Sequence, residues 1–487
     1  MDLLKTPLTN QLFVVSGIYS AIVSCGLGLG YPEVSYNSND LSWKEPNIRY
    51  AETVGEISFV LSVFLIPYFS DKRGRKMANV IATLSLLLSW IIRIFSLNFL
   101  SHIIINVLFN IGLGGTVAIS SVIISEYCSP KYRSAFLLLE TAAISFGILL
   151  SHTCNIFSET TLISTFGMLF SGTNLVMVNY WPESPYWLIS QDHFLSCMEA
   201  FCHLHGTDEE ASKELKLMLE TQKIKLQLEA LKPVRRLKIR ERIKSYMRSL
   251  LKAEFLRPLS IAILLFTFIG FGGENVAANY AIRDIFNLNK KYIGTIVLDV
   301  LSLICSLTAC VLIQIVKRKT LFMFTGSCSV MFLALISLFL SLKSFNLISQ
   351  DYIWLYLTWV TGFSMFMSLG TTALPFSILG EIFPMSYKGI GNSVTCAYFW
   401  AFGNSLFKLV PWLAASIGMY GVFILSITFM TAILLIVNNI LPETSILSLV
   451  EIEKLFKVEG GDISENVVGV AEPEENTRFD GLKLLIE

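Results

Sequence analysis

Residues 380–389 read GEIFPMSYKG, and residues 125–134 read SEYCSPKYRS. Each stretch leaves a long apolar run with a glutamate and carries a proline within the next four positions. Each then reaches a tyrosine beside a basic residue at the same distance from its glutamate: Tyr387-Lys388 in one, Tyr132-Arg133 in the other. Two matching exits from apolar runs predict that the chain contains an internal repeat.

A second pair of stretches supports the repeat. Residues 182–185 read PESP and close an apolar run 57 residues after Glu126, whereas residues 442–445 read PETS and close one 62 residues after Glu381. The two matches occur in the same order along the chain. We therefore expect two parallel halves, an arrangement on which one class of secondary transporters is built.

The composition places these halves in a membrane. Of the 487 residues, 53% are hydrophobic and 15% are charged, and the mean hydropathy is +0.61. Soluble chains carry roughly 25% charged residues, so this composition indicates a polytopic membrane protein in contact with the lipid bilayer. The formal net charge is zero, which gives no reason to expect a nucleic-acid partner.

Apolar runs of the length needed to cross a bilayer, roughly 20 residues, occur about twelve times. Only helices are expected there, because backbone polar groups must be satisfied within each segment. The sequence thus predicts an all-α membrane protein with twelve transmembrane helices in two six-helix pseudo-repeat halves. The expected spans lie near residues 12–31, 53–70, 77–97, 100–126, 135–156, 160–181, 258–280, 292–316, 321–342, 352–380, 390–416 and 419–441.

Basic residues collect in the loops between spans two and three, four and five, eight and nine, and ten and eleven. By the positive-inside rule this side is cytoplasmic, which also places both termini in the cytosol. The expected organisation is a first half at 1–190, a helical cytoplasmic linker at 191–257, a second half at 258–456 and a cytoplasmic tail at 457–487. The linker is expected to form surface helices broken at Pro233.

The end of span two reads PYFSDKRGRK over residues 67–76. This stretch resembles the G-x-x-x-D-R-x-G-R-[RK] loop of the major facilitator superfamily, with Pro67 in place of the first glycine. The repeated glutamate stretches, the PESPYWL run at 182–188 and the Leu441–Glu453 segment resemble the sugar porter branch. Trp400 and Lys408 resemble the eleventh span of insect facilitated trehalose transporter-like proteins. The resemblance covers essentially the whole chain and implies an alternating-access carrier.

The resemblance also implies a cytoplasmic gate of charged helix ends. Glu126 is expected to reach toward Lys388 and Glu381 toward Arg133, with Glu183 and Glu443 bracing the base and Asp71 and Arg75 in the span-two loop. Several exposed pairs of about 0.2–1 kcal/mol each reach the scale of a two-state equilibrium that a substrate can reverse. The competing interpretation is that these charges only anchor loops.

In sugar porters, amides in spans five, seven and eight and a tryptophan in span ten hold the sugar. Here Ile269 and Gly270 replace the paired glutamines of span seven, which argues against hexose or trehalose, since a site lacking bidentate amides discriminates hydroxyls less well. The residues predicted to line a substrate cavity are Thr141, Asn275, Asn279, Ser302, Phe376 and Trp400. Ordinary helix packing is the alternative role for each.

Ionisable residues inside spans are expensive and point to function. Glu140, Glu274, Asp299 and Lys408 are the candidates, with Arg93 near the end of span three. Glu140 and Glu274 adjoin the expected substrate positions and are candidates to bind protons or a cationic group. The proton symporters that this chain resembles carry an aspartate in span one, whereas no carboxylate lies between Phe13 and Tyr31 here. Downhill facilitated transport is therefore the simpler interpretation.

The sequence therefore predicts a plasma-membrane carrier of a small polar solute, most simply a hexose- or trehalose-like sugar. The alternatives are a carrier of a non-sugar organic solute, a proton-coupled carrier, and a transport-inactive sensor. The stretch QIVKRK at 314–319, where the family has D-R-x-G-R-[RK], favours the sensor, and the retained gate residues oppose it. The five histidines lack metal-ligand spacing and no nucleophile–base pair is suggested, so neither an enzyme, a cofactor nor a metal site is expected.

Overall fold

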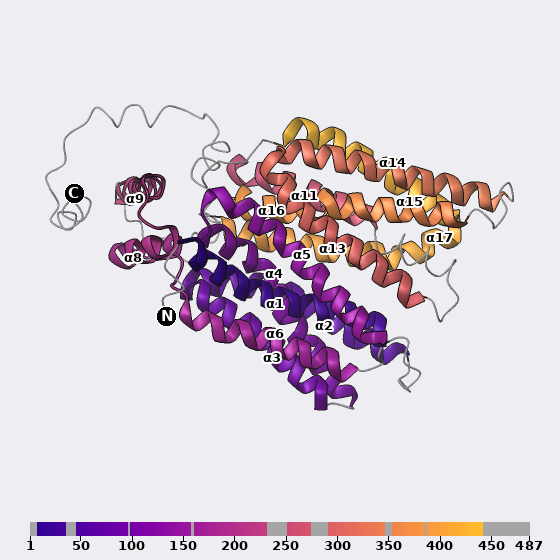
Figure 1. Cartoon of the computed structure of the whole chain (residues 1–487), viewed down its shortest axis with the longest axis horizontal. Coiled ribbons are helices and arrows are strands. Elements are labelled where there is room, and N and C mark those ends of the chain that lie inside the picture. Colours follow the sequence, from indigo (N-terminus) through magenta and orange to yellow (C-terminus); the bar gives the residue numbers. More distant parts are fainter. Residues whose placement is uncertain are drawn as a thin grey trace.

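The computed structural model is a bundle of long helices with further helices lying across one end (Figure 1). No strand occurs among the residues that it describes. These residues are 7–35, 45–95, 98–156, 160–230, 251–273, 291–345, 353–384 and 387–441.

The first half of the chain folds into six long helices, shown in indigo to magenta in Figure 1. Their apolar residues form long runs that only an internally hydrogen-bonded helix can carry through lipid. Pro130 opens the fifth helix at a position where its missing N–H costs nothing. The six are α1 Pro7–Ser35, α2 Glu45–Arg73, α3 Arg75–Phe95, α4 Phe99–Tyr127, α5 Pro130–Ile156 and α6 Thr160–Met177, which continues as the 3₁₀ turn η2 Val178–Tyr180.

The second half, in orange to yellow, supplies the other spans. Span ten consists of α15, the π-helical turn η5 and α16, and spans eleven and twelve form α17, which breaks at Gly418 with φ 74° and ψ 161°. That φ favours glycine. Among the described residues, eleven helices are long and apolar enough to cross a membrane, α17 counted once. The elements are α11 Ala253–Gly272, α13 Lys291–Ile315, α14 Arg318–Ser344, α15 Ile353–Phe366, η5 Met367–Thr371, α16 Ala373–Ile382 and α17 Lys388–Ile440.

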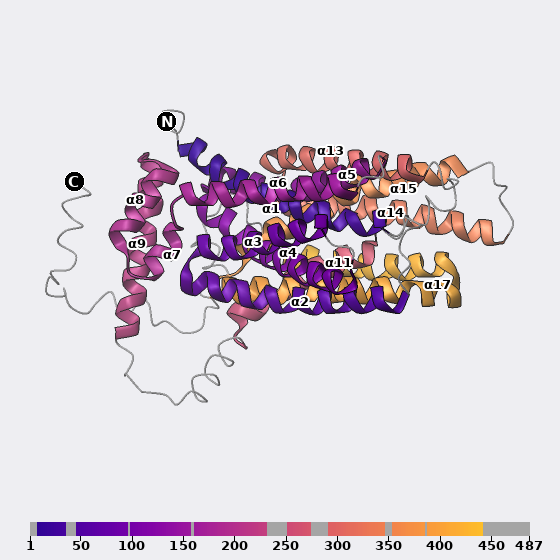
Figure 2. The same ribbon diagram turned by 90° about the horizontal axis from the view of Figure 1, so that it is seen from below.

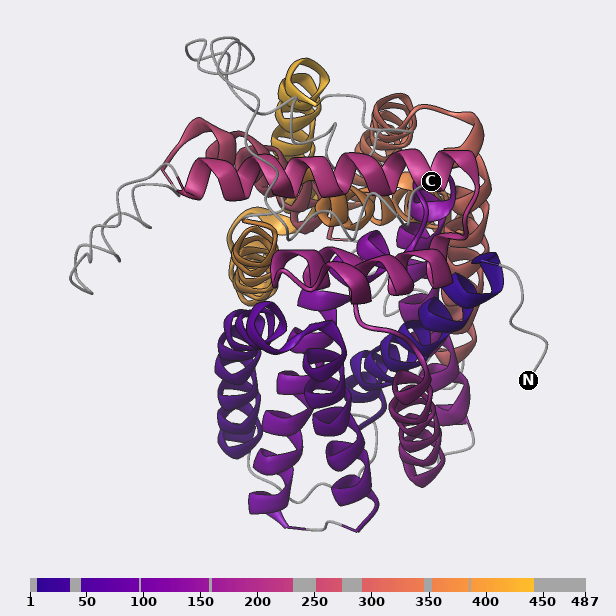
Figure 3. The same cartoon turned by 90° about the vertical axis from the view of Figure 1, so that its left-hand side faces the viewer.

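Three further helices lie across one end of the bundle: α7 Pro185–Ser190, α8 Phe194–His205 and α9 Glu209–Ala230. Figure 2 shows α8 and α9 roughly perpendicular to the spans, and Figure 3 looks onto this end. Tyr186, Cys197 and Phe201 belong to a small apolar core of their own. Side chains of α1 tie α8 to the bundle, since Asn10 and Gln11 donate to the carbonyls of His203 and Leu204 at 2.6 and 2.9 Å. Helices α8 and α9 lie within the stretch that the sequence assigns to a linker, and Pro233 lies outside the described residues.

Within the first half, α1 packs on α5 and α6, and α2 packs on α4. The approach of α1 to α5 requires glycine. A Cβ on Gly26 would come within 3.0 Å of Gly147 Cα, and a Cβ on Gly147 would come within 2.9 Å of Leu27 N. The two backbones therefore touch at a point that no larger residue fits.

The halves meet along three sets of helices. Helix α5 packs against α13, α17 against α2 and α4, and α16 against α4 and α5. Polar and ionisable side chains on these helices are thus brought to the surface between the halves. Side chains that the chain separates by more than two hundred residues meet there.

Candidate functional site: a central cavity between two polar ends

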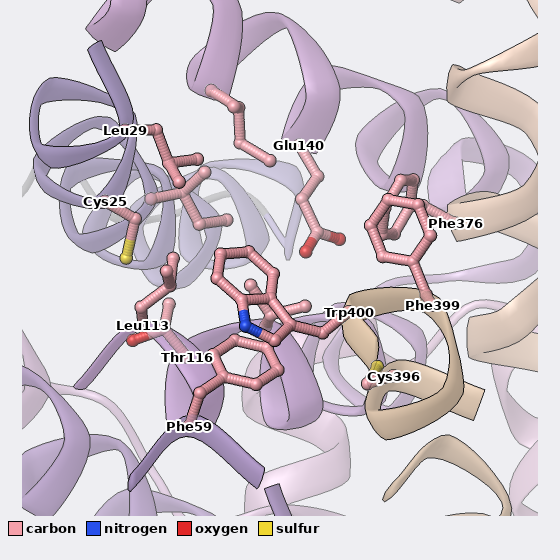
Figure 4. Close-up of a pocket in the computed structure, with 13 residues that line it drawn as sticks. Cys25, Leu29, Phe59, Leu113, Thr116, Glu140, Phe376, Cys396, Phe399 and Trp400 are labelled. Atoms are coloured by element: carbon pink, nitrogen blue, oxygen red, sulfur yellow. The ribbon is translucent and has the colours of Figure 1, made fainter. Parts of the chain in front are cut away.

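A cavity of about 80 Å³ lies between the halves, near the middle of the spans. Its walls come from α1, α2, α4 and α5 of the first half and from α16 and α17 of the second. They are apolar apart from a few groups, and Figure 4 shows Glu140 and Trp400 facing the same space. This volume is small beside the roughly 300–1,000 Å³ of ligand pockets, so the two halves lie close together around it, and we call this arrangement the closed form. The lining residues are Ile22, Cys25, Leu29, Phe59, Leu113, Thr116, Val117, Glu140, Ile144, Phe376, Cys396, Phe399 and Trp400.

Of the six predicted substrate residues, Phe376 and Trp400 line this cavity. Thr141 does not: it is buried and its hydroxyl donates to the Leu138 carbonyl of its own helix at 2.7 Å. Ser302 bonds to Ser368 across α13 and η5 at 2.7 Å, away from the lining. Asn275 and Asn279 lie outside the described residues, as does Glu274. Among the ionisable candidates that the structure describes, only Glu140 lines the cavity.

At the α7–α9 end, the first half contains a buried charge cluster. Arg75, at the start of α3, donates to both oxygens of Glu126, through Nε to Oε2 at 3.0 Å and Nη2 to Oε1 at 2.9 Å. Glu126 also accepts from Ser184 Oγ at 2.6 Å, and it is fully buried. Asp71 pairs with Arg75 Nη1 at 2.7 Å. Two parallel N–H···O bonds make this a strong, well-oriented pair.

Glu183 sits beside this cluster, where α3 begins. Its Oε1 accepts from the backbone N–H groups of Arg75 at 2.8 Å and of Ser184 at 3.0 Å. The start of a helix leaves N–H groups unpaired and favours a negative charge. Burial raises the pKa of the Glu183 carboxyl, although these N–H donors act in the opposite direction.

The second half repeats the pair. Arg318, at the start of α14, donates to Glu381, at the end of α16, through Nη1 to Oε2 at 2.5 Å and Nη2 to Oε1 at 3.2 Å. Both side chains are buried. The stretch at 314–319 departs from the family motif but keeps Arg318, the counterpart of Arg75. The repeat inferred from the glutamates is therefore also a repeat of their arginine partners.

The pairing across the halves differs from the prediction. Glu381 contacts Arg318 and not Arg133, because Arg318 begins α14, a neighbouring helix in the same half as Glu381. Arg133 instead lies 3.8 Å from Glu214 of α9. Lys388 does not pair directly with Glu126. Its Nζ donates to Oγ of Ser125, the residue before Glu126, at 2.6 Å. From this position the ammonium group still attracts the Glu126 carboxylate. Glu443 lies outside the described residues.

Hydroxyl and amide groups make the contacts between the halves at this end. Besides Lys388–Ser125, Asn392 Nδ2 donates to Ser121 Oγ at 3.1 Å, and Arg318 Nη2 donates to Ser134 Oγ. The N-terminal end of α17 also touches the loop after span two, since a Cβ on Gly389 would lie 2.8 Å from Asp71 Oδ2. In this form the α7–α9 end is closed.

The opposite end is held by a hydrogen-bonded histidine–aspartate pair and by one ion pair, and both cross the halves. His152 of α5 lies 2.6 Å from Asp299 of α13, and Lys408 of α17 lies 3.0 Å from Glu56 of α2. The first pair is mostly buried, with side chains 12% and 19% exposed, whereas Lys408 is 61% exposed. A functional role for Asp299 and Lys408 stays a prediction, and the sequence did not indicate their partners, His152 and Glu56.

Arg93 lies over aromatic rings near the far end of span three, 4.0 Å from the Tyr31 ring centre and 5.1 Å from that of Trp90. These cation–π contacts keep it away from the cavity lining.

Sequence reasoning missed several residues that complete these sites: Arg318, Ser125, Ser134, Ser184, Glu214 and Phe59. A signal existed for Arg318 alone, since it stands at the same place before span nine as Arg75 does before span three. Serines are common in these spans, and nothing in the pattern distinguishes those that face the other half.

A family model described as sugar (and other) transporter matches residues 53–456. The chain belongs to this family. The facilitated trehalose transporter Tret1 of Drosophila erecta is 26% identical over 338 residues, covering 68% of this chain and 38% of the relative. The Tret1-2 homolog of Drosophila simulans is 26% identical over 336 residues and is covered over 66% of its length. The chain thus spans about two fifths of the first relative.

Solved structures show the same fold as this sugar-transporter-family chain. The proton:xylose symporter XylE bound to 6-bromo-6-deoxy-D-glucose aligns with a TM-score of 0.73, at 16% identity, over 93% of this chain and 99% of the symporter. The inward open conformation of XylE from E. coli gives 0.59 at 17% identity over 92% and 100%. The human organic anion transporter MFSD10 gives 0.57 at 14% identity over 88% and 99%. The chain therefore has the major facilitator superfamily fold and is a multi-pass membrane protein.

Proposed function

We propose that this chain is a facilitated sugar carrier that works by alternating access. The family to which it belongs and the trehalose transporters that it resembles support this function. So does one structural observation: the central cavity lies between the halves, with polar contacts between the halves on both sides of it. A carrier passes through such a closed form between its two open states, and breaking one set of contacts opens one side.

The gate in this proposal consists of the two buried ion pairs, Arg75–Glu126 and Arg318–Glu381, together with the hydroxyl contacts that they position. Each ion pair fixes the ends of two helices within one half. Ser125, adjacent to Glu126, then receives Lys388 from the other half, while Arg318 itself donates to Ser134. The halves can separate without uncovering an unpaired charge of either arginine, because each keeps its carboxylate. Opening at this end therefore breaks hydrogen bonds to serine hydroxyls and keeps both ion pairs.

The proposed location is the plasma membrane, with both termini and α7–α9 in the cytosol. The division into halves at 1–190 and 258–456, a linker at 191–257 and a tail at 457–487 belongs to the same proposal. Cys202 of α8 is exposed, so it reports on the orientation. A membrane-impermeant maleimide is expected to label Cys202 only after the cells are permeabilised. Labelling of Cys202 on intact cells would contradict the orientation.

Transport itself is tested by counterflow into proteoliposomes, with trehalose, D-glucose and other hexoses as the labelled solutes. We expect saturable counterflow of at least one sugar. Glu381→Ala is expected to abolish it, whereas Glu209→Ala, which alters an exposed carboxylate of α9, is expected to leave it unchanged. Absence of counterflow for every solute of the panel would contradict the carrier and favour a sensor that keeps the fold.

A further inference from the structure

Glu140 is the one charged residue among those that line the central cavity. It lies on α5 and is 3% exposed. Its Oε1 accepts a hydrogen bond from Ser120 Oγ of α4, but its Oε2 has no hydrogen-bond partner among the described residues. Figure 4 shows the carboxylate directed into the space beside Trp400, Phe376 and Phe399. No lysine or arginine of the described chain pairs with it.

Aromatic rings make up much of the surface around this carboxylate. Phe59 of the first half stacks on Trp400 of the second, with ring centres 4.3 Å apart and planes 18° apart. Phe376 and Phe399 meet edge to face, with centres 5.8 Å apart. The faces of such rings attract a cation, and more strongly when water is excluded. The carboxylate and the rings therefore both favour a positively charged group on the ligand.

The buried charge of Glu140 favours a cationic solute over a neutral one. An ionised carboxylate in apolar surroundings is costly unless a positive charge accompanies it. A neutral sugar can donate hydroxyls to Glu140 but leaves the negative charge uncompensated. A protonated amine supplies both donors and the missing charge. Trp400 Nε1, which is buried and has no partner among the described residues, adds a donor for a hydroxyl oxygen of the same solute.

We infer that the cavity binds a solute carrying a protonated amine, with Glu140 as the residue that receives the amine and the rings of Phe59 and Trp400 beside it. The inference rests on the proposed function, which makes the solute an amino sugar. In the closed form, about 80 Å³ is enough for an ammonium group, since a water molecule needs roughly 10–15 Å³ on this scale. We take this form to be that of the empty carrier, and with a whole sugar bound the two halves lie farther apart around the cavity.

The test compares three solutes that differ at one position: D-glucosamine, D-glucose and N-acetyl-D-glucosamine, in which the amine is neutralised. Counterflow into proteoliposomes is measured for the wild type and for Glu140→Gln, which keeps the shape and the Ser120 contact but removes the charge. Glu209→Gln, the same change at a carboxylate that is 83% exposed, is the matched control. We expect the wild type to prefer glucosamine over both neutral solutes, and Glu140→Gln to lose that preference by about tenfold or more, while Glu209→Gln keeps it.

Two further measurements keep the test decisive if Glu140→Gln folds poorly. Glu140→Asp, which retains the charge, is expected to keep the preference for glucosamine at reduced affinity. Glucosamine is also expected to raise the apparent melting temperature of the wild-type protein at concentrations where glucose does not.

Three results would overturn the inference. The first is glucose counterflow equal to that of glucosamine in the wild type and in Glu140→Gln, which would leave the proposed sugar carrier intact. The second is glucose uptake that an inward proton gradient accelerates and Glu140→Gln abolishes. A proton, and not an amine of the solute, would then neutralise the Glu140 carboxylate. The third is absence of counterflow for all three solutes together with no thermal shift, which would contradict the proposed function as well.

Discussion

Two arginines that begin helices, Arg75 and Arg318, each bind a glutamate that ends another helix of the same half. Water solvates neither pair, since Glu126 and Arg318 are 0% and 2% exposed. Removing one member of a buried pair leaves the other charge uncompensated, which is far more destabilising than the loss of a surface pair. The stability of each half therefore depends on both members being present.

We accordingly predict that Glu381→Gln lowers the stability of the second half by about 3–5 kcal/mol. The apparent melting temperature in detergent, followed by tryptophan fluorescence, provides the measurement. The double variant Glu381→Gln/Arg318→Met, which removes both charges, should recover much of the loss, and Glu209→Gln should melt with the wild type. A single variant that melts with the wild type would mean that the pair is not held in the dry environment described above.

His205 offers a prediction for pH. It is buried on α8, stacked on Phe201 with ring centres 4.4 Å apart, and neither ring nitrogen has a hydrogen-bond partner among the described residues. Burial, with a smaller contribution from the Arg133 charge, lowers the pKa of His205 to about 3. An exposed histidine binds its proton near pH 6.5. Between these two values the undocked form of α8 therefore holds more protons than the docked form.

The consequence is that docking of α8 weakens as the pH falls below about 6.5, by up to about 1.4 kcal/mol per pH unit. Hydrogen exchange of the α8 amides, corrected for the intrinsic rate at each pH, should reveal more opening at pH 5.5 than at pH 7.5. His205→Leu, which cannot take up a proton, should remove the difference. If wild type and variant respond alike to pH, another group is responsible.

At the scale of elements, the hydrogen-bonded pair His152–Asp299 ties α5 to α13, and the ion pair Lys408–Glu56 ties α17 to α2. Exposed ion pairs contribute about 0.2–1 kcal/mol, so Lys408–Glu56 is the weaker tie. Breaking the mostly buried His152–Asp299 contact leaves a buried polar group without its partner, which costs more. Both lie on the side of the cavity away from α7–α9. Loosening them should open the cavity on that side only.

Cys25 and Cys396, which are buried in the cavity wall, report on this opening. In a Cys202→Ser background, Asp299→Asn is expected to speed the reaction of Cys25 and Cys396 with an impermeant maleimide added to intact cells. Lys408→Ala should act in the same direction with a smaller effect. Lys213→Ala, which breaks an exposed pair within α9, should have none. Unchanged labelling in Asp299→Asn would show that this pair does not hold the far end closed.

At the scale of the whole molecule, the two ends of the bundle should respond in opposite ways. Lys388→Met combined with Asn392→Ala removes two contacts between the halves, to Ser125 and Ser121. We expect maleimide to reach Cys25 and Cys396 faster from the α7–α9 side, in inside-out vesicles, and more slowly from the other. A gain in labelling from both sides at once would contradict alternating access, because the two openings would no longer exclude each other.

Much of this arrangement could be predicted from sequence. Apolar runs of bilayer length specify helices wherever they occur, so the spans and the repeat followed directly. Polar residues were predicted less well. Phe376, Trp400 and Glu140 do line the cavity, whereas Thr141 and Ser302 use their hydroxyls within the helix bundle. A small rotation about a helix axis moves a residue from the cavity into a helix–helix contact, and spacing along the chain does not determine that rotation.

The sequence by itself determined that this protein crosses a membrane as two related sets of six helices with charged ends, because hydrophobic length and charge placement act locally along the chain. Only the tertiary structure decided which charges are partners. Glu126 and Glu381 bind arginines of their own halves, and hydrogen bonds and an ion pair distributed between the two ends join the halves to each other. Partner choice depends on distances between helices, and these distances are set by the packing of the whole bundle, which spacing along the chain does not specify.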